Sequence, residues 1–292
     1  MKYPKLINRK ETERLMERLS LSAKKKFGQN FLTDEKVLDR IIKGAGISET
    51  DTVLEIGPGF GTLTQALSEN AGHVIAVEID KDLIPVLSET LTGYDNVTVI
   101  NGDIMEADIT ELLHTPLPGG KTPENTCYKV AANLPYYITT PVIMKILESG
   151  APVESITVMV QKEVGERMQA APGGKDYGVL SLSCQYYCDV KVIANVPSCS
   201  FIPRPGVDSV VVNMKRHSEP PVKVKDEQYM FELIRLGFSQ RRKTLLNNLK
   251  TRYGKETAEL AIKEAGLPAD IRGERLSLSD FALLSDILMS HE

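Results

Sequence analysis

Acidic side chains and glycines follow three successive strand-like runs of this sequence. Gly57, Gly59 and Gly61 stand between a predicted strand and a predicted helix, where glycine permits a tight turn and close approach of the backbone to a ligand. Glu78 ends the second run, where a carboxylate can accept both hydroxyls of a ribose, and Asp103 ends the third, where it could accept an exocyclic adenine amine. Because ligands of open α/β sheets bind at the carboxyl ends of strands, these positions together predict a nucleoside site.

The glycine spacing indicates which class of nucleoside ligand to expect. It is G-x-G-x-G with Pro58 inside it, not the G-x-G-x-x-G spacing that cradles a pyrophosphate. A nucleoside without a pyrophosphate suits S-adenosylmethionine better than NAD. Taken singly, the glycines also fit a plain tight turn, and each acid also fits a helix N-cap or a solvated loop charge.

A fourth run ends in "NLPYY", a combination suited to holding an amine. Asn133 offers a carbonyl oxygen as an acceptor, and Pro135 fixes the backbone so that the Leu134 carbonyl points in one direction. Two acceptors can hold both hydrogens of adenine N6, which draws the nitrogen toward tetrahedral geometry and frees its lone pair to attack a methyl group. Tyr136 supplies a stacking face for the base. The pattern predicts methylation of a planar amine; the alternative is an Asn-Pro turn beside core tyrosines.

Short β-branched runs that alternate with amphipathic segments must position these residues. The alternation predicts βαβ units, and thus an α/β fold with a seven-stranded, mostly parallel sheet whose last two strands form an antiparallel edge pair. An irregular loop is expected over 108–126. The expected strands are 52–57, 73–79, 97–101, 128–133, 155–161, 190–197 and 207–217.

The character of the sequence changes near residues 218–225. Residues 226–292 contain no strand signal and predict three or four helices. We therefore expect two domains: 1–220, which carries the predicted nucleoside and amine sites, and 221–292, which is small and all-helical. An N-terminal extension over 1–23 is expected to contain one short helix, "ETERLMERL".

Composition limits the class of protein. With 42% hydrophobic and 25% charged residues the chain can build an ordinary globular core. The sequence contains no apolar run of about 18 residues, so we expect no membrane span. The polar N-terminus favours a cytoplasmic protein without a signal peptide. The four cysteines form no C-x-x-C pair and the four histidines are scattered, so we expect no metal site. A strong exposed apolar pattern is lacking, which favours a monomer.

Five motifs in order resemble one known family. They are "KKKFGQNFL" (24–32), "EIGPGFGTLT" (55–64), "NLPYYITTP" (133–141), "FIPRPGVDS" (201–209) and "FSQRRKTLLNNL" (238–249). Together they resemble the small-subunit ribosomal RNA adenine dimethyltransferases from about residue 24 to the C-terminus. The resemblance implies a class I, Rossmann-like fold and S-adenosylmethionine as cofactor. It also implies dimethylation of N6 of two adjacent adenosines in the 3′-terminal hairpin loop of 16S rRNA, on RNA or a pre-small-subunit particle during ribosome biogenesis.

The resemblance also implies two sets of site residues. The expected cofactor contacts are Asn30, Leu32, Gly57, Gly59, Glu78, Asp103, Ile104 and Asn133. The expected catalytic residues are Asn133, Leu134, Pro135, Tyr136 and Phe201. Phe201 would close over the second face of the target base; the alternative is a core aromatic at the start of a strand.

Net charge is −4, so RNA binding requires a local concentration of positive charge. Between residues 235 and 255 there are seven Lys or Arg and no acid, and two arginines interrupt the apolar stripe near 241. Either a helix breaks there or the arginines face phosphate, although a solvated basic turn is the alternative. The expected RNA contacts are Lys24, Lys25, Lys26, Arg241, Arg242 and Lys243. With the resemblance, this predicts that 1–220 binds S-adenosylmethionine and carries catalysis and that 221–292 binds RNA.

Two rival functions stay open. One is the related class that methylates an adenine in large-subunit RNA and confers macrolide resistance, which shares the Asn-Leu/Ile-Pro-Tyr chemistry. The other is a ribosome assembly factor or transcription factor that binds nucleic acid without turnover. The intact 133–136 motif argues against a purely structural role.

Overall fold

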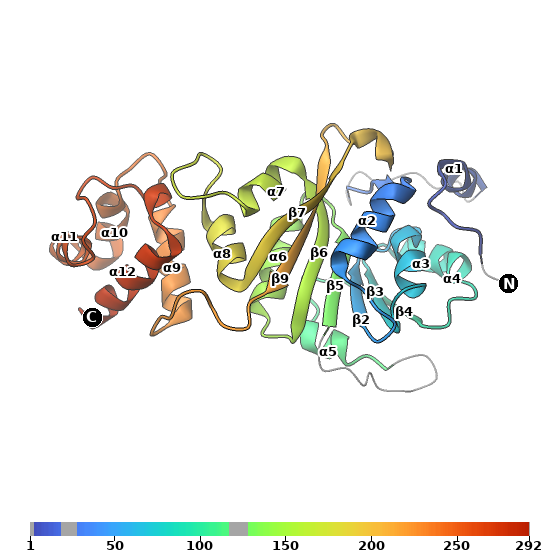
Figure 1. The fold of residues 1–292 in the computed structure, drawn as a ribbon, viewed down its shortest axis with the longest axis horizontal. Helices are drawn as coiled ribbons and strands as arrows, with labels where there is room; N and C mark the ends of the chain where they lie inside the picture. The colour runs from blue at the N-terminus through green and yellow to red at the C-terminus, as the bar shows by residue number, and fades with distance from the viewer. Residues whose placement is uncertain (1–2, 19–27, 117–127, 292) are drawn as a thin grey trace. The chain divides into compact units, whose positions relative to one another are not determined.

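The computed structural model describes residues 3–18, 28–116 and 128–291 (Figure 1). Its chain divides into two compact units. The first unit comprises residues 1–165 and 190–216, and the second comprises residues 166–189 and 217–292.

A seven-stranded sheet in the order β4-β3-β2-β5-β6-β9-β7 organises the first unit (Figure 1). Neighbours from β4 to β6 run parallel, and β9 pairs antiparallel with β6. This confirms the predicted α/β class and the mostly parallel sheet. The strands are β2 (Thr52–Ile56), β3 (His73–Glu78), β4 (Val97–Asn101), β5 (Tyr128–Asn133), β6 (Val153–Gln161), β7 (Cys188–Val196) and β9 (Ser209–Arg216).

The central strands bring their carboxyl ends to one edge of the sheet. All residues of β2 and β3 are buried, as expected for parallel strands covered on both faces. The register aligns Ile56 with Val77 and Ala132, and Glu78 with Asn101. The loops that follow β2, β3, β4 and β5 therefore begin at nearly the same level.

Helices connect these strands. Asp34 caps α2 through hydrogen bonds from the backbone N–H groups of Lys36 and Val37. A separate two-stranded pairing joins β1 (Phe31–Leu32) to β8 (Phe201–Ile202). The helices of this unit are α1 (Arg9–Arg18), α2 (Glu35–Ala45), α3 (Thr62–Ser68), α4 (Ile84–Thr90), α5 (Ile109–Leu113) and α6 (Thr139–Glu148), with 3-10 turns η2 (Lys81–Leu83) and η3 (Ser198–Ser200).

Two expectations about local structure had different outcomes. The short N-terminal helix is confirmed as α1. The irregular loop expected over 108–126 is wrong for its first residues, because α5 begins there. Asp108 caps that helix by accepting hydrogen bonds from the N–H groups of Thr110 and Glu111. Residues 117–126 lie outside the described residues.

The second unit is helical and has its own core. The chain enters it within α7 (Lys162–Met168) and forms α8 (Val179–Tyr187), then returns to it after β9. Tyr177, Leu182 and Tyr186 pack in one apolar cluster with the C-terminal helices. Residues 166–189 thus belong to this unit, although the sequence suggested a single boundary near residue 220. The C-terminal helices are α9 (Glu227–Gly237), α10 (Leu245–Tyr253), α11 (Lys255–Glu264) and α12 (Leu278–Ser290), with η4 (Gly273–Arg275).

Candidate active site

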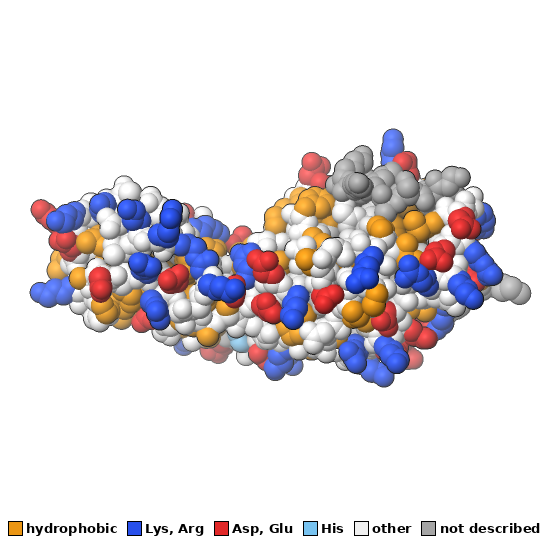
Figure 2. All heavy atoms as spheres, turned by 90° about the horizontal axis from the view of Figure 1, so that it is seen from above, with side chains coloured by type: hydrophobic (Ala, Val, Ile, Leu, Met, Phe, Trp, Pro, Cys, Tyr) orange, Lys and Arg blue, Asp and Glu red, His pale blue; other side chains and the backbone are white. Residues whose placement is uncertain are grey.

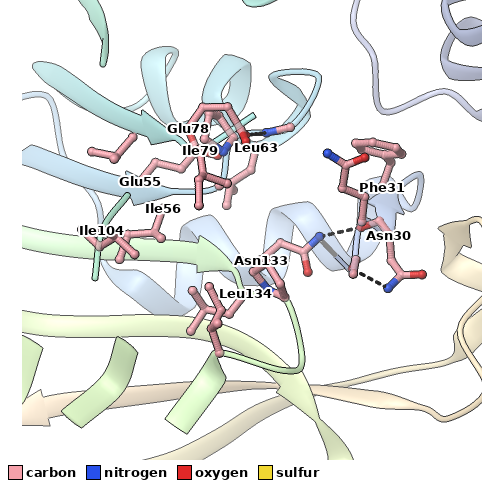
Figure 3. A pocket seen from close by; sticks show the side chains of 18 of the residues that line it. Asn30, Phe31, Glu55, Ile56, Leu63, Glu78, Ile79, Ile104, Asn133 and Leu134 are labelled. Atoms are coloured by element: carbon pink, nitrogen blue, oxygen red, sulfur yellow. Dashed lines mark hydrogen bonds between the residues drawn. The ribbon is translucent and has the colours of Figure 1, made fainter. Parts of the chain in front are cut away.

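One pocket of the first unit collects most of the predicted site residues (Figure 3). It is formed at the carboxyl ends of β2, β3 and β5 and by residues 28–32. Segments far apart in sequence therefore meet at one sheet edge, where open α/β folds bind ligands. The predicted residues in its lining are Asn30, Leu32, Gly57, Gly59, Glu78, Asp103, Ile104, Asn133, Leu134, Pro135 and Tyr136.

The glycine loop leaves open space beside it. Gly57 and Gly59 have φ angles of 70° and 60°, in the left-handed region that favours glycine. A Cβ at Gly57 would meet no atom within 4 Å, whereas a Cβ at Gly59 would come within 3.1 Å of the Phe31 ring. The loop is thus open toward a ligand at Gly57 and closed by an aromatic ring at Gly59.

Glu78 is fixed at the end of β3. Its side chain accepts hydrogen bonds from Gly59 N at 3.1 Å and from Asp80 N at 2.8 Å, one on each carboxylate oxygen. The residue is 4% exposed, and this burial raises the pKa of its carboxyl. Each oxygen retains a further lone pair, so the side chain is oriented in advance to accept the hydroxyls of a ribose.

Asp103 and Ile104 contribute differently to the same lining. Ile104 is 4% exposed and offers an apolar surface. Asp103 is half-buried, and its Oδ1 accepts a hydrogen bond from Met105 N at 2.8 Å. That bond stabilises the turn after β4, which agrees with the alternative role of Asp103 as a loop residue. A Cβ at the neighbouring Gly102 would meet no atom within 4 Å, so open space adjoins this turn.

The side-chain amide of Asn133 has a defined orientation. Its Nδ2 donates a hydrogen bond to the backbone oxygen of Asn30 at 2.9 Å, and the Asn30 side chain donates to the Gly28 oxygen at 3.0 Å (Figure 3). Because Nδ2 is used in this way, Oδ1 is the part of the amide left to accept a hydrogen bond from a ligand. Residues 28–30 therefore orient the residue predicted to hold an amine.

Leu134 and Tyr136 complete the motif in distinct ways. Leu134 is 1% exposed as a whole residue and belongs to the lining of the pocket. The Tyr136 hydroxyl lies 2.7 Å from Ser209 Oγ, which fixes the ring, and burial raises the pKa of that hydroxyl. Pro135 accepts hydrogen bonds through its backbone oxygen from Ile138 N and Thr139 Oγ1, both at 3.1 Å. The Pro135 oxygen thus stabilises the turn that leads into α6, which begins at Thr139.

Phe201 does not lie where the resemblance implied. It is 1% exposed, pairs with Leu32 through β8 and β1, and packs in the apolar core of the first unit. A ring buried in this way presents no face to a base, and it is absent from the pocket lining. The alternative of a core aromatic at the start of a strand accounts for its place.

The predicted RNA contacts divide into three groups. Arg241 donates to the backbone oxygens of Lys175 and Tyr177 at 2.7 and 2.9 Å, which ties together two segments of the second unit. Arg242 and Lys243 are exposed in the turns between α9 and α10, so a helix break explains the interrupted apolar stripe. Lys24, Lys25 and Lys26 lie outside the described residues. In Figure 2 lysine and arginine side chains are spread over the visible face, including the part formed by the C-terminal helices, with acids among them.

Glu55 is a further residue of the pocket, and none of the sequence motifs predicts its role. This residue of β2 lines the pocket, is 1% exposed, and has a carboxylate oxygen, Oε2, without a hydrogen-bond partner among the described residues. Burial raises the pKa of its carboxyl to about 8. An acid inside the otherwise apolar strand "TVLEI" was the available signal, because a buried carboxyl is rarely kept without a partner.

Glu55 is expected to make the stability of the unliganded protein depend on pH. Its pKa is about 8 in the folded chain and near 4.5 when unfolded, so the unfolded state loses the proton first. The contribution of Glu55 to the free energy of unfolding is fully present below pH 4.5. It is lost as pH rises to about 8, by at most about 1.4 kcal/mol per pH unit. Urea unfolding from pH 5 to 8 should show this slope in the wild type and a flatter one in Glu55→Gln. An equal slope in both proteins would contradict the assignment, and exposed Glu154→Gln is the matched control.

Two classes of feature are absent from the described parts of the chain. Residues 3–18, 28–116 and 128–291 contain no group of three or more His, Cys, Asp or Glu placed to hold a metal ion. None of the helices within those ranges is long and apolar enough to cross a membrane.

Comparison with known proteins gives one consistent family. The family model described as "Ribosomal RNA adenine dimethylase" matches residues 20–289. The chain is 53% identical over 284 residues to "Ribosomal RNA small subunit methyltransferase A" of Lachnoclostridium phytofermentans, with 96% of each chain covered.

Two solved structures share the fold at lower identity. A dimethyladenosine transferase from Plasmodium falciparum is 28% identical, with a TM-score of 0.71, over 87% of this chain and 95% of the other. The 23S rRNA methyltransferase ErmE is 26% identical, with a TM-score of 0.65, over 89% of this chain and 100% of the other. The small-subunit relative is thus about twice as similar in sequence as this large-subunit enzyme.

Proposed function

This chain belongs to the ribosomal RNA adenine dimethylase family, and we propose that its pocket binds S-adenosylmethionine beside the target adenine. The protein is an enzyme that uses S-adenosylmethionine to dimethylate adenine N6 in small-subunit (16S) rRNA. Its proposed target is the pair of adjacent adenosines in the 3′-terminal hairpin loop. We propose that it acts in the cytoplasm, where small subunits are assembled.

The pocket has the chemistry needed for S-adenosylmethionine. Gly57 opens onto free space that a side chain would fill, Glu78 presents an oriented carboxylate for a ribose, and Ile104 offers an apolar surface for an adenine. Asn30, Leu32 and Gly59 line the end nearer the glycine loop, where we place the methionine portion. Bound there, the cofactor supplies an electrophilic methyl group on a sulfonium.

The amide of Asn133 carries the proposed mechanism. Its Oδ1 and the backbone oxygen of Leu134 accept the two N6 hydrogens of the target adenine, while Tyr136 stacks on the base. Held in this way, the N6 lone pair would point toward the methyl group that the bound cofactor would supply as an electrophile. The methylated nitrogen would release its proton to solvent, so no strong base is required before attack. Catalysis rests on orientation and hydrogen bonding.

One observation supports this assignment most directly. The hydrogen bond from Asn133 Nδ2 to Asn30 leaves the carbonyl side of the amide as the acceptor, in the same pocket as Glu78. A residue kept only for an Asn-Pro turn would not need an amide oriented by a segment 103 positions away.

The function is tested with purified protein and methyl-labelled S-adenosylmethionine. Unmodified small-subunit particles and large-subunit RNA are offered in parallel, and the label is mapped by nuclease digestion. We expect dimethyladenosine in the 3′ hairpin of small-subunit rRNA. Label in large-subunit RNA would move the target to the resistance class, and no label despite bound cofactor would favour an assembly factor without turnover.

We propose that RNA contacts the exposed turn at Arg242 and Lys243. Replacing both with alanine is expected to weaken RNA binding at every sequence and to lower the slope of log K against log salt by about 1–2, since each removes one phosphate contact. Titration at three salt concentrations measures this. The control replaces Lys255 and Lys263, two exposed lysines of α11, and an equal loss in the control would refute a contact specific to the turn.

We further propose that the enzyme is a monomer. The large apolar side chains exposed in the described residues are Ile79, Met105, Tyr137, Val207, Leu260 and Leu283. Ile79 and Tyr137 line the cofactor pocket, which gives their exposure a role other than contact with a second subunit. Light scattering at micromolar concentration tests the oligomeric state.

A further inference from the structure

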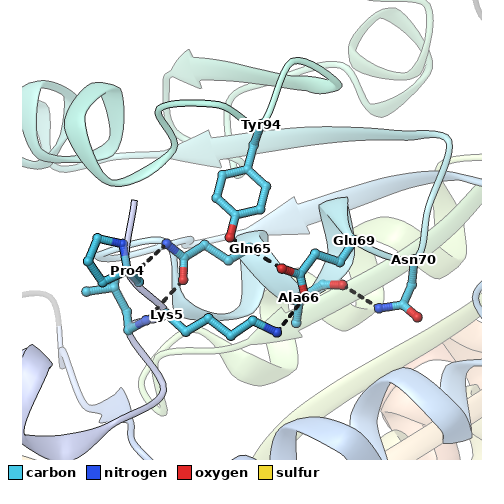
Figure 4. Close-up of polar contacts among 8 residues, drawn as sticks. Pro4, Lys5, Gln65, Ala66, Glu69, Asn70 and Tyr94 are labelled. Carbon is cyan, nitrogen blue, oxygen red and sulfur yellow. Dashed lines mark hydrogen bonds and ion pairs between the residues drawn. The ribbon is translucent and has the colours of Figure 1, made fainter. Parts of the chain in front are cut away.

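Residues 3–18, here called the N-terminal segment, precede the part of the chain that the family model matches, and they are anchored to α3 by a buried glutamine (Figure 4). Gln65 is 4% exposed. Its Oε1 accepts a hydrogen bond from Leu6 N at 3.0 Å, and its Nε2 donates to the oxygens of Pro4 and Thr90 at 3.4 and 3.0 Å. A buried amide without partners is costly, so Gln65 suits a protein in which the segment is in place.

Contacts at the surface hold the segment at both ends. Tyr3 N donates to the Thr92 oxygen at 3.2 Å, and Lys5 forms an ion pair with Glu69 at 2.9 Å (Figure 4). Near the end of α1, Arg18 pairs with a glutamate of α4 at 2.5 Å. Exposed ion pairs contribute little stability individually, but they define where the segment lies.

The apolar side of the segment contacts the wall of the cofactor pocket. Leu6 and Leu15 are 0% and 2% exposed, and they form one cluster with Phe31 and Phe60. The two phenylalanine rings stack with centroids 3.8 Å apart and planes 14° apart. Both phenylalanines also line the pocket. The stacked pair therefore shares one apolar cluster with the N-terminal segment and also lines the cofactor pocket.

The same pair adjoins both functional parts of the pocket. The Phe31 ring lies against the glycine loop, 3.1 Å from where a Cβ of Gly59 would be. Phe31 also follows Asn30, whose backbone oxygen accepts the hydrogen bond from Asn133. A displacement of Phe31 would thus alter the glycine-loop side and the orientation of the Asn133 amide.

We propose that the N-terminal segment is a positioning element of the active site, in which Leu6 and Leu15 hold the Phe31–Phe60 pair and thereby set the shape of the cofactor pocket. This rests on the proposed function, because it takes the pocket to be the S-adenosylmethionine site. Leu15 touches no reacting atom; it acts through Phe31 and Phe60.

The test uses full-length protein with Leu15→Ala, Leu15→Val and Leu15→Met. Calorimetry with S-adenosylmethionine gives Kd, and steady-state assays give KM for cofactor and for RNA. We expect Leu15→Ala to raise Kd and cofactor KM about tenfold, with RNA KM within twofold of wild type. Leu15→Val should give a smaller increase, and Leu15→Met should restore wild-type values because it refills the space.

The control separates positioning from general destabilisation. Leu113 of α5 is fully buried in the same unit but belongs neither to the pocket lining nor to the cluster around Phe31. Leu113→Ala should lower the unfolding temperature comparably and leave Kd within twofold. A folded Leu15→Ala, or Leu15→Val if the alanine variant does not fold, with unchanged Kd would overturn the inference alone. A wild-type protein that binds no S-adenosylmethionine would overturn the proposed function and this inference with it.

Discussion

Replacing Asn133 with alanine is expected to lower turnover by about two to three orders of magnitude, the size of effect seen when one preorganised hydrogen-bonding group is removed from an active site. The Asn133 amide is oriented by the Asn30 backbone so that its oxygen can accept an N6 hydrogen of adenine. Without that acceptor, only the Leu134 carbonyl remains to hold the amine. Single-turnover methyl transfer to small-subunit particles measures the loss.

Cofactor binding separates this role from a structural one. We expect the Kd for S-adenosylmethionine to change by no more than about threefold in Asn133→Ala, because the side chain faces the amine rather than the nucleoside. Asn213 is the matched control: it is also half-buried, lies on the same sheet and donates one side-chain hydrogen bond, to Thr157 Oγ1 at 2.8 Å. If cofactor affinity fell in step with activity, the assignment of Asn133 to the amine would be wrong.

Replacing Glu78 with alanine should act first on cofactor affinity. The carboxylate accepts two backbone N–H groups and is expected to accept the ribose hydroxyls as well. Hydrogen bonds to a charged group contribute about 1.5–3 kcal/mol, so Kd should rise roughly 10- to 100-fold. At saturating cofactor, turnover should return to within about fivefold of wild type.

One outcome for the Glu78 variant would contradict its assignment. Unchanged cofactor affinity would remove Glu78 from the ribose site. Because Gly59 N and Asp80 N lose their acceptor in the variant, thermal unfolding must accompany the binding measurement. Exposed Glu154→Ala, on β6, controls for the loss of one negative charge.

Sequence patterns were sufficient for the sheet and for the residues at its strand ends. β-branched runs alternating with amphipathic segments specify parallel strands, and polar residues at the ends of such strands meet at one edge. Glu78, Asp103 and Asn133 could be placed in one pocket for that reason. These inferences depend only on local periodicity and on the small number of sheet topologies that alternating strands and helices can form.

The features that sequence patterns left open all involve contacts between distant residues. An aromatic at the start of a strand suits a core or a site equally well, and only the pairing of β8 with β1 places Phe201 in the core. Arg241 could face phosphate or backbone, and the oxygens it contacts lie more than 60 residues away. The N-terminal segment has an amphipathic helix whose partner no spacing rule identifies.

The discontinuity of the second unit affects how the chain acquires its structure during synthesis. The side chains of Tyr177, Leu182 and Tyr186 emerge before the helices that cover them, which begin only at Glu227. The apolar side chains of residues 166–189 therefore stay exposed to solvent while β7 and β9 complete the sheet, until the C-terminal helices have been synthesised. A nascent chain stalled near residue 216 would be prone to aggregate, and a fragment meant to represent the helical unit alone must join 166–189 to 217–292.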